Sequence, residues 1–323
     1  MSNQFSKTAI ASVALMRIKG IGRRAAVRIV NGALESADDE QTLFDRAARN
    51  KVDTAQLREA WKYAEDQLDR SASSGISSVA FHDVNFPSRL QTIPDPPAVL
   101  FIKGNPVAMT SRNTLAIVGT REPTEYGERI TQRLAASAVN MGFTIVSGLA
   151  HGCDTLAHRG CVEANGTGVA VLAHGLDKVY PAANKGLAQT LLDTGGCLLS
   201  EYPVGMTPMK TAFAERDRLQ SGLSDGVMVI ETDIKGGTMH TVRFARQQKR
   251  ALACIEHPEA WRSAPKAQGN RQMIADRWAE PIGNADGLVA FLQRLKSRGP
   301  TNSEAPANAD DTQISMDFLN DHI

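Results

Sequence analysis

Four glycine-rich loops each follow a run of apolar, β-rich residues, and their composition suits the binding of an anion. They are Gly119-Thr120-Arg121, Ser147-Gly148-Leu149-Ala150, His174-Gly175-Leu176-Asp177 and Gly236-Gly237-Thr238. Glycine lets backbone N–H groups approach an anion closely, and a following helix N-terminus adds partial positive charge. One such loop often serves turn geometry alone. Several in one protein, with Arg121 among them, favour a phosphate-binding edge.

A second set of residues combines one aromatic ring with three cations. It is the segment Lys210-Thr211-Ala212-Phe213-Ala214-Glu215-Arg216-Asp217-Arg218, which precedes the apolar run 227–230. An aromatic ring can stack on any base while lysine and arginine hold the backbone, a combination typical of single-stranded nucleic acid binding. The segment also fits the solvated start of a helix with Phe213 in the core.

A third set lies near the N-terminus, in residues 15–29. The sequence LMRIKGIGRRAAVRI places Gly20-Ile21-Gly22 between two short apolar helices, as in a helix-hairpin-helix motif. Such a hairpin presents backbone N–H groups to a phosphate without reading sequence. Lys19, Arg23 and Arg24 would reinforce this possible secondary DNA contact, although Lys19 stands where the motif usually has proline. The alternative is a hairpin that serves only as a packing unit.

The common signatures of nucleotide enzymes and metal sites are absent. There is no GxxxxGK[ST] motif, and no GxGxxG follows the first run with an acid about 20 residues on. His151, His158 and His174 lack metal-ligand spacing, and Asp154 is predicted to be a helix N-cap rather than an acid–base partner of His158. Since no nucleophile or acid–base pair stands out, we expect a protein that is not an enzyme and has no metal and no cofactor.

The order of elements predicts how the loops are positioned. Apolar runs alternate with helical patterns over residues 76–297, which predicts βαβ units and a parallel sheet covered on both faces, with ligands at the carboxyl ends of the strands. The runs are 115–118, 144–146, 169–172, 197–199, 227–230 and 252–255, and the helical patterns are 126–141, 154–165, 185–193 and 238–248. The preceding segment 79–106 is predicted to be extended, because its prolines at 87, 94, 96 and 97 oppose a helix.

Composition divides the chain into three zones. Residues 1–72 show helical spacing of Ala, Leu and Arg, and the Ser/Gly-rich stretch 71–75 is a candidate linker. Residues 76–297 form the predicted sheet domain. Residues 298–323 form an acidic tail that we expect to be disordered apart from its last ten residues. The predicted class is therefore α/β, with a small helical, helix-hairpin-helix-like domain in front and a flexible tail behind.

Overall composition excludes several protein classes. The 323 residues are 42% hydrophobic and 22% charged, as expected of a globular protein. Arginine outnumbers lysine, 24 to 12, which suits bidentate phosphate contacts. No apolar run approaches the roughly 20 residues that span a bilayer, and the N-terminus is too polar for a signal peptide. Four cysteines without CxxC spacing predict reduced, buried thiols in a cytoplasmic protein.

The tail ends in a short apolar motif. Ile314, Met316, Phe318 and Leu319 follow a stretch rich in Ala, Asn and Asp. A spacing of Gln-x-x-Met-x-Phe from Gln313 looks like the peptides that engage the bacterial sliding clamp. Another partner and docking on the protein's own body are the alternatives.

In combination, these motifs resemble the DprA/Smf family of DNA-processing proteins. The family-like stretches run in family order from residue 86 to residue 274 and include FPSRLQTIPDPPAVLFIKG (86–104), AIVGTREPTEYG (116–127), SGLAHGCDTLAHRG (147–160), FAERDRLQSGLS (213–224) and GGTMHTVRFA (236–245). The resemblance implies an extended Rossmann-like domain that forms a homodimer, binds single-stranded DNA without sequence preference and loads RecA recombinase during natural transformation.

The resemblance also implies which residues bind DNA. It assigns this role to Arg121, Lys210 and Phe213, with Arg216 and Arg218 close by. The loops Ser147-Gly148 and Gly236-Gly237-Thr238 would face the same groove.

The chain also departs from the family pattern. Asp217 stands between two arginines where asparagine is usual, His257-Pro258 replaces a proline-glycine pair, Met239-His240 occupies a usually apolar stretch, and the acidic tail replaces a frequent winged helix.

Two other classes of function stay open on the sequence. A Rossmann-like nucleotide-binding enzyme or sensor resembling phosphoribohydrolases would carry a PGGxGTxxE signature. Here Gly236-Gly237-Thr238 lacks the preceding proline and the spaced glycine and glutamate. The third class is an interaction scaffold that works through the helical region and the tail.

Overall fold

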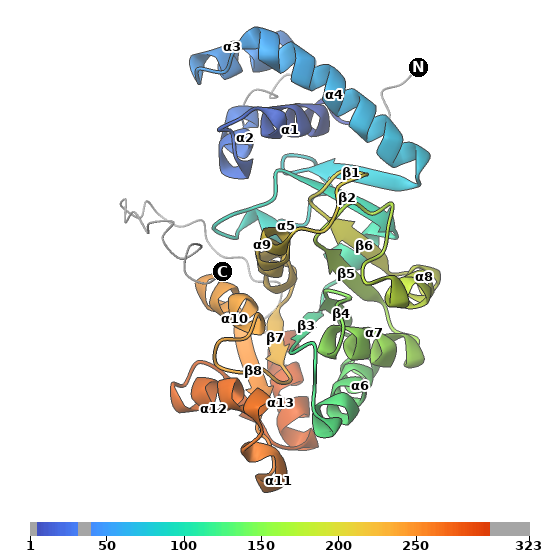
Figure 1. Ribbon diagram of the computed structural model, residues 1–323, viewed down its shortest axis with the longest axis vertical. Coiled ribbons are helices and arrows are strands. Elements are labelled where there is room, and N and C mark those ends of the chain that lie inside the picture. Colours follow the sequence, from blue (N-terminus) through green and yellow to red (C-terminus); the bar gives the residue numbers. More distant parts are fainter. Residues whose placement is uncertain (1–4, 32–39, 298–323) are drawn as a thin grey trace.

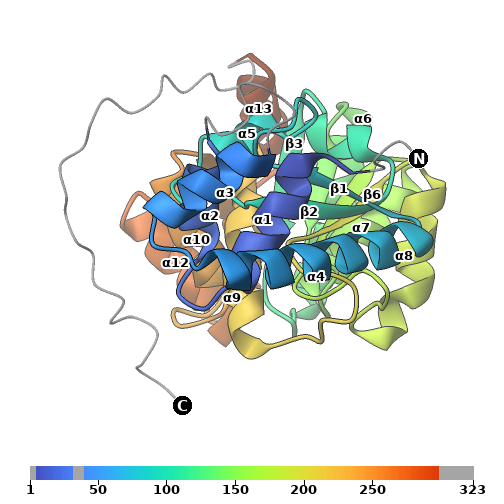
Figure 2. The ribbon, with the colours of Figure 1, turned by 90° about the horizontal axis from the view of Figure 1, so that it is seen from above.

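The computed structural model describes residues 5–31 and 40–297, so the predicted tail and its apolar motif lie outside the described residues. A layer of helices covers one end of a sheet, and further helices flank both faces of that sheet (Figures 1 and 2). The helical layer consists of α1 (Lys7–Arg17), α2 (Arg23–Val30), α3 (Glu40–Arg49) and α4 (Thr54–Ser73).

The helices of this layer have recognisable start signals. Ser6 caps α1 by accepting a hydrogen bond from the Ala9 amide, and Asp53 caps α4 by accepting one from the Gln56 amide. Between α1 and α2, Gly20 adopts a φ of +88°, a conformation that favours glycine. The predicted pair of helices joined by a glycine turn is therefore present.

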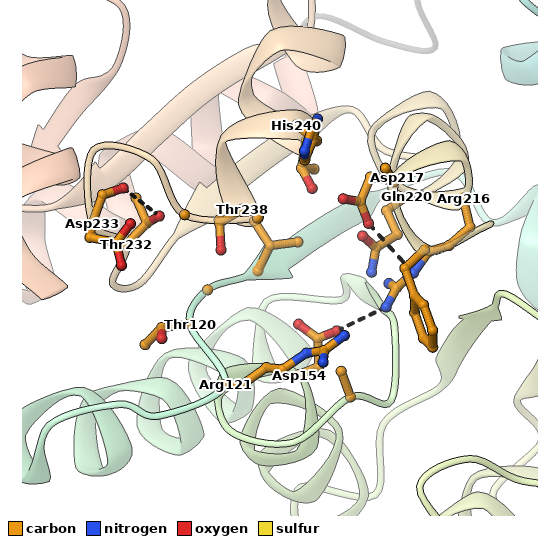
Figure 3. Close-up of a pocket in the computed structure, with 18 of the residues that line it drawn as sticks. Thr120, Arg121, Asp154, Arg216, Asp217, Gln220, Thr232, Asp233, Thr238 and His240 are labelled. Carbon is orange, nitrogen blue, oxygen red and sulfur yellow. Dashed lines mark hydrogen bonds and ion pairs between the residues drawn. The ribbon is translucent and has the colours of Figure 1, made fainter. Parts of the chain in front are cut away.

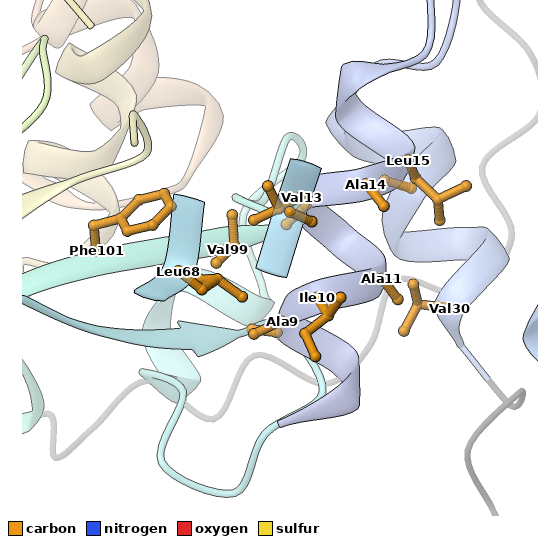
Figure 4. Packing of buried hydrophobic residues seen from close by; sticks show 14 of the residues in the cluster. Ala9, Ile10, Ala11, Val13, Ala14, Leu15, Val30, Leu68, Val99 and Phe101 are labelled. Carbon is orange, nitrogen blue, oxygen red and sulfur yellow. The ribbon is translucent and has the colours of Figure 1, made fainter. Parts of the chain in front are cut away.

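One hydrophobic cluster joins the helical layer to the sheet. Figure 4 shows Ile10 and Leu15 of α1 and Leu68 of α4 in the same cluster as Val99 and Phe101 of a sheet strand. These side chains are at most 3% exposed. The boundary between two domains near residues 71–75 stays a prediction, because the core is continuous across it.

The sheet has nine strands in the order β1-β2-β6-β5-β4-β3-β7-β8-β9. Its strands are β1 (Ile76–Ala80), β2 (Val99–Gly104), β3 (Thr114–Val118), β4 (Thr144–Ser147), β5 (Gly168–Leu172), β6 (Cys197–Ser200), β7 (Gly226–Val229), β8 (Ala251–Ile255) and β9 (Glu280–Ile282). The β1–β2 and β2–β6 pairs are antiparallel, and all the other pairs are parallel.

Both faces of the central strands are buried. On β3, Leu115 and Ile117 join one cluster while Ala116 and Val118 join another, because successive side chains point to opposite faces. The first face is covered by α6 (Glu125–Asn140), α7 (Cys153–Glu163) and α13 (Ala285–Ser297), and the second by α9 (Lys210–Gly222), α10 (Thr238–Gln247) and α12 (Gln268–Ala275). Helix α8 (Lys185–Asp193) contributes Ala188 and Leu191 to the cluster of the helical layer.

The strand order reverses between β3 and β7. From β3 the chain proceeds to β4, β5 and β6 on one side, and then β7, β8 and β9 continue on the other side of β3. The loops after β3 and β7 therefore leave in opposite directions and open a crevice at the carboxyl ends of these strands. Ligands of open α/β sheets bind at such a topological switch point.

The predicted fold class and all six predicted runs are confirmed, as α/β with a mostly parallel Rossmann-like sheet. One prediction for segment 79–106 was wrong, because the short helix α5 (Ser88–Gln91) lies within it. Pro87 occupies the N-cap of that helix, where its missing N–H costs no hydrogen bond. Among the described residues, no helix has the length and apolar character needed to cross a membrane.

Candidate nucleic-acid interface

A cavity of about 430 Å³ lies at the switch point between β3 and β7 (Figure 3). We call it the switch-point cavity. Its walls come from the loop after β3, the start of α7, helix α9, the loop after β7 and the start of α10. It brings together several residues predicted to bind DNA, namely Arg121, Lys210, Phe213, Arg216, Gly236, Gly237 and Thr238.

The rim of the cavity carries exposed cations beside an aromatic ring. Arg121 and Lys210 are exposed, and the guanidinium carbon of Arg121 lies 5.3 Å from the centre of the Phe213 ring. Phe213 is half-buried and belongs to none of the hydrophobic clusters. Tyr180, which is 51% exposed, lies with its ring centre 6.0 Å from that of Phe213. The rim thus offers two aromatic rings and two cations to solvent.

The floor of the cavity is built around a buried arginine. Arg216 is 5% exposed, and its Nη2 lies 3.6 Å from Asp154 Oδ2 while its Nε lies 3.4 Å from Asp217 Oδ1 (Figure 3). A Cβ on residue 148 would overlap the Arg216 guanidinium, so a larger residue there would displace the arginine side chain. Gly148 therefore leaves room for the arginine to reach Asp154.

The acids of the floor resist ionisation. Burial raises the pKa of Asp217 to about 7, and the charge of Asp154 adds to this rise, whereas Arg216, a hydrogen bond from Thr241 and the charge of Arg121 lower it. Burial likewise raises the pKa of Asp154, against the effect of Arg216. Asp217 therefore gains and loses a proton near neutral pH, within reach of a bound anion.

The formal charges of the cavity lining balance. The cations are Arg121, Lys210, Arg216 and Lys266, and the acids are Glu122, Asp154, Asp217 and Asp233. Lys266 Nζ pairs with Asp233 at 3.2 Å, and Arg216 is paired as described above. Within the described part of the chain, Arg121 and Lys210 form no ion pair. These two side chains are consequently the cations available to a phosphate.

The loop that carries Arg121 is fixed by Glu231, at the end of β7. The Glu231 carboxylate accepts hydrogen bonds from the Thr124 amide (2.8 Å) and the Thr124 hydroxyl (2.6 Å), and His257 Nε2 lies 3.2 Å from it. Burial alone would raise the pKa of Glu231, but the hydrogen bonds from His257 and Thr124 outweigh it and lower that pKa. Its backbone carbonyl also accepts from the Thr120 amide at 2.7 Å. Glu231 thus anchors this loop at two points.

The start of α7 packs closely against the same loop. Gly152 has a φ of +73°, and a Cβ on it would overlap the backbone of Thr120 and Arg121. Gly152 is also the N-cap of α7. The prediction of Asp154 as N-cap was therefore wrong; Asp154 lies inside the helix, where it accepts from the Gly148 amide at 3.1 Å and pairs with Arg216.

Three residues predicted to face this groove do not line it. Ser147 is fully buried and donates its hydroxyl to the Ile117 carbonyl at 2.7 Å, and Gly148 packs against Arg216. Arg218 is 2% exposed and donates to both carboxylate oxygens of Glu201 at 2.6 Å. The sequence pattern contained the arginine but not the acid, 17 residues away, that engages it.

The N-terminal hairpin lies outside the cavity. Lys19, Gly20, Gly22 and Arg24 are exposed on its turn and on the start of α2. The predicted phosphate contact of Arg23 needs correction, because its guanidinium is engaged by carboxylates, among them Glu215 at 2.6 Å.

Sequence reasoning missed Gln220 and Lys266, which line the cavity, and Tyr180, which lies beside Phe213 at its rim. Gln220 is 1% exposed, its Nε2 has no hydrogen-bond partner, and it lies three residues after Asp217 on α9, so helical periodicity could have predicted it. Lys266 lies in a short 3-10 helix (Pro265–Ala267) and Tyr180 in the loop after β5, and neither segment carries a local signal for the site.

His158 and the four cysteines are buried in the fold. His158 is fully buried, and burial lowers its pKa to about 4, so its ring is neutral at physiological pH. All four cysteines are buried free thiols. Across residues 5–31 and 40–297, we find no group of three or more His, Cys, Asp or Glu side chains that could hold a metal ion.

Comparison with curated proteins finds relatives of the DprA/Smf family. DNA processing protein DprA of Bacillus subtilis is 34% identical over 217 residues, which cover 66% of this chain and 73% of that protein. Protein Smf of Synechocystis is 42% identical over 213 residues, which cover 65% of this chain and 52% of the relative. The chain thus matches about half the length of the Smf proteins of Synechocystis and Escherichia coli, with 52% and 46% covered.

Solved structures give the same assignment. The X-ray structure of DprA from Streptococcus pneumoniae aligns with a TM-score of 0.74 at 26% identity, covering 87% of this chain and 97% of that one. DNA processing protein A of Helicobacter pylori, whose structure concerns its single-stranded DNA binding mode, aligns with a TM-score of 0.61 at 28% identity, covering 70% and 97%. The family model for DNA recombination-mediator protein A matches residues 77–293. The chain therefore belongs to the DNA recombination-mediator protein A family, the DprA/Smf proteins.

Proposed function

We propose that this protein binds single-stranded DNA, without sequence preference, across the rim of the switch-point cavity. The observation that carries this proposal is the convergence of Arg121, Lys210 and Phe213 at the strand ends where an α/β sheet binds ligands. The two cations reach phosphates, and the aromatic rings offer stacking faces to bases. Gly236, Gly237 and Thr238 add backbone and hydroxyl donors at the start of α10.

The cellular role that fits this site is that of a recombination mediator. We propose that the protein acts as a homodimer in the cytoplasm, loads RecA recombinase onto the strand it holds, and serves DNA processing in natural transformation. It would act by binding and not as an enzyme. Sliding-clamp binding through the tail stays a separate prediction.

The charge balance of the cavity defines how tightly DNA is held. Because Arg216 and Lys266 are already paired with acids, the phosphate contacts depend on Arg121 and Lys210. Each phosphate neutralised on a single strand adds about −0.7 to the slope of log affinity against log salt concentration. A shallow slope, equivalent to a few phosphates per protomer, is expected.

Binding of fluorescent oligothymidylate and of a blunt duplex of equal length, measured by anisotropy over a salt series, tests the proposal. We expect preference for the single strand and loss of binding as salt rises. The variant Arg49→Ala serves as a control, because Arg49 lies on α3 and does not line the cavity. Equal affinity for the duplex would contradict the proposal. RecA filament formation on the coated strand, followed with and without the protein, tests the mediator role separately.

A further inference from the structure

Arg23, the first residue of α2, is surrounded by three carboxylates from other parts of the fold. Its Nη1 lies 3.0 Å from Asp95 Oδ2, its Nη2 lies 2.6 Å from Glu215 Oε2, and its Nε lies 4.0 Å from Glu201 Oε1. Asp95 belongs to the loop before β2, Glu201 follows β6, and Glu215 is on α9. One arginine of the helical layer therefore contacts three elements of the sheet region.

Arg218 completes this network from the opposite side. It binds Glu201 through both terminal nitrogens and donates its Nε to the Asp95 carbonyl at 2.9 Å. Arg23 and Arg218 thus share Glu201 and Asp95. The Tyr202 hydroxyl donates to Glu215 at 3.3 Å. The network joins α2 to α9, which lie toward the same side of the molecule in Figures 1 and 2.

The guanidinium of Arg23 is shielded from solvent, whereas two of its three acid partners are partly exposed. The Arg23 side chain is 19% exposed, and its partners Glu201, Asp95 and Glu215 are 6%, 39% and 44% exposed. Burial alone would lower the pKa of Arg23, but the charges of Glu201, Asp95 and Glu215 outweigh it and raise that pKa. Partly buried, mutually shared ion pairs lose more when one partner is removed than isolated surface pairs do.

Helix α9 carries both this network and the rim of the switch-point cavity. Lys210 and Phe213 line the cavity, and Glu215, two residues after Phe213, points toward Arg23. Given the single-stranded DNA site proposed above, on which this inference rests, we propose that Arg23 is a positioning residue for DNA binding. Through Glu215 it holds the first turns of α9, where Phe213 lies beside Arg121 and Lys210 lines the same cavity. The N-terminal hairpin then supports DNA binding without a phosphate contact from Arg23.

Direct contact and positioning predict opposite effects of neutralising Glu215. If Arg23 contacted a phosphate, removing the acid that competes for it would strengthen DNA binding, since like charges repel. If Arg23 positions α9, removing Glu215 breaks the contact and weakens DNA binding. The sign of the change therefore separates the two.

The test uses the full chain with Arg23→Ala, Arg23→Lys and Glu215→Gln, the Arg23→Ala/Glu215→Gln double variant, and Arg28→Ala as a matched control. Arg28 is an exposed arginine on the same helix. Oligothymidylate affinity, melting temperature and amide hydrogen exchange of residues 210–215 are measured. We expect Arg23→Ala and Glu215→Gln each to weaken binding by about tenfold, without adding in the double variant, as coupled residues do. Arg23→Lys should restore part of the affinity, and exchange in residues 210–215 should accelerate.

Tighter or unchanged binding by Glu215→Gln would overturn the proposal, as would equal losses from Arg23→Ala and Arg28→Ala. A lower melting temperature with unchanged affinity and unchanged exchange in residues 210–215 would reduce Arg23 to a structural role and overturn it too. If the unmodified protein bound no oligothymidylate, the proposed function would fail. The exchange measurement would still decide whether Arg23 holds α9.

Discussion

The two sides of helix α9 both carry basic side chains, but these are exposed on one side and enclosed by acceptors on the other. On the side of the switch-point cavity, Lys210 is exposed and lines the same cavity as Arg121, and neither cation has an acid partner in the described structure. On the opposite side, Arg218 is enclosed by Glu201 and the Asp95 carbonyl at 2.6–2.9 Å. The comparison shows that the carboxylates around an arginine, more than its place in a basic motif, decide whether it can bind a phosphate.

The largest effect is expected on the enclosed side, from Arg218→Ala. It removes both short hydrogen bonds to the buried Glu201 carboxylate and leaves only Arg23, at 4.0 Å, as a nearby cation, which should lower the free energy of unfolding by about 3–5 kcal/mol. Arg70→Ala is the matched control, because its pair with Asp66 is exposed (63% and 65%) and contributes at most about 1 kcal/mol. Urea titration measures both. An Arg218→Ala protein that kept its stability but lost DNA binding would place Arg218 in the DNA site after all.

On the open side, Arg121→Ala should change affinity without changing stability. Loss of a charge-assisted hydrogen bond to phosphate weakens oligothymidylate binding by about 1.5–3 kcal/mol. The melting temperature should stay constant, because Arg121 is an exposed loop residue. Anisotropy and thermal melting on the same samples check this, and a fall in melting temperature with unchanged affinity would reverse the comparison.

The aromatic rings sharpen the same comparison. Phe213→Ala should weaken DNA binding by about 1–3 kcal/mol if a base stacks on the ring. Tyr180→Ala should cause a smaller loss, because Tyr180 neighbours Phe213 but does not line the cavity. The variant Phe213→Leu is measured in the same assay. It keeps an apolar side chain without a ring, so its oligothymidylate affinity distinguishes base stacking from simple apolar contact. A larger loss for Tyr180 than for Phe213 would move the binding surface toward the β5–α8 loop.

The smallest expected effect concerns pH. Burial raises the pKa of Asp217 to about 7, whereas an aspartate of the unfolded chain titrates near pH 4. Between these two values the folded protein holds a proton that the unfolded chain has already released. Stability therefore falls as pH rises through that range and is constant above it. A phosphate near the Asp217 carboxylate favours its protonated form, so DNA affinity should fall between pH 6 and pH 8. For each unit by which bound DNA shifts the pKa of Asp217, the affinity should change by less than about tenfold.

Asp217→Asn removes this titration and should flatten the affinity profile. Glu122→Gln removes an exposed acid at the same rim and should leave the pH dependence in place. Identical slopes for the unmodified protein and Asp217→Asn would assign the pH dependence to another group.

Much of the fold was predictable because local patterns dictate it. Buried parallel strands read as continuous apolar runs, and each of the six predicted runs became a strand of the sheet. Strand β9 was not predicted, since its three residues include Pro281 and offer no periodicity. Helix α5 was missed because prolines were weighed as helix breakers, although Pro87 stands at the one end of a helix that tolerates proline.

The cavity was predictable only in part. Loops at strand ends identified Arg121 and Gly236, and the aromatic-cationic segment identified Lys210 and Phe213. Arg23 and Arg218 are engaged by Glu201 and Asp95, which are distant in sequence, and so they are not free to bind a phosphate. Such ion pairs are set by tertiary packing, so motif spacing could not distinguish an available arginine from an enclosed one.

A structure of the protein with a short oligothymidylate tests the central claim most directly. We expect phosphate oxygens within hydrogen-bond distance of Arg121 and Lys210, a base against Phe213, and Arg23 still paired with Glu215. DNA bound along the α1–α2 hairpin with the switch-point cavity unoccupied would contradict it.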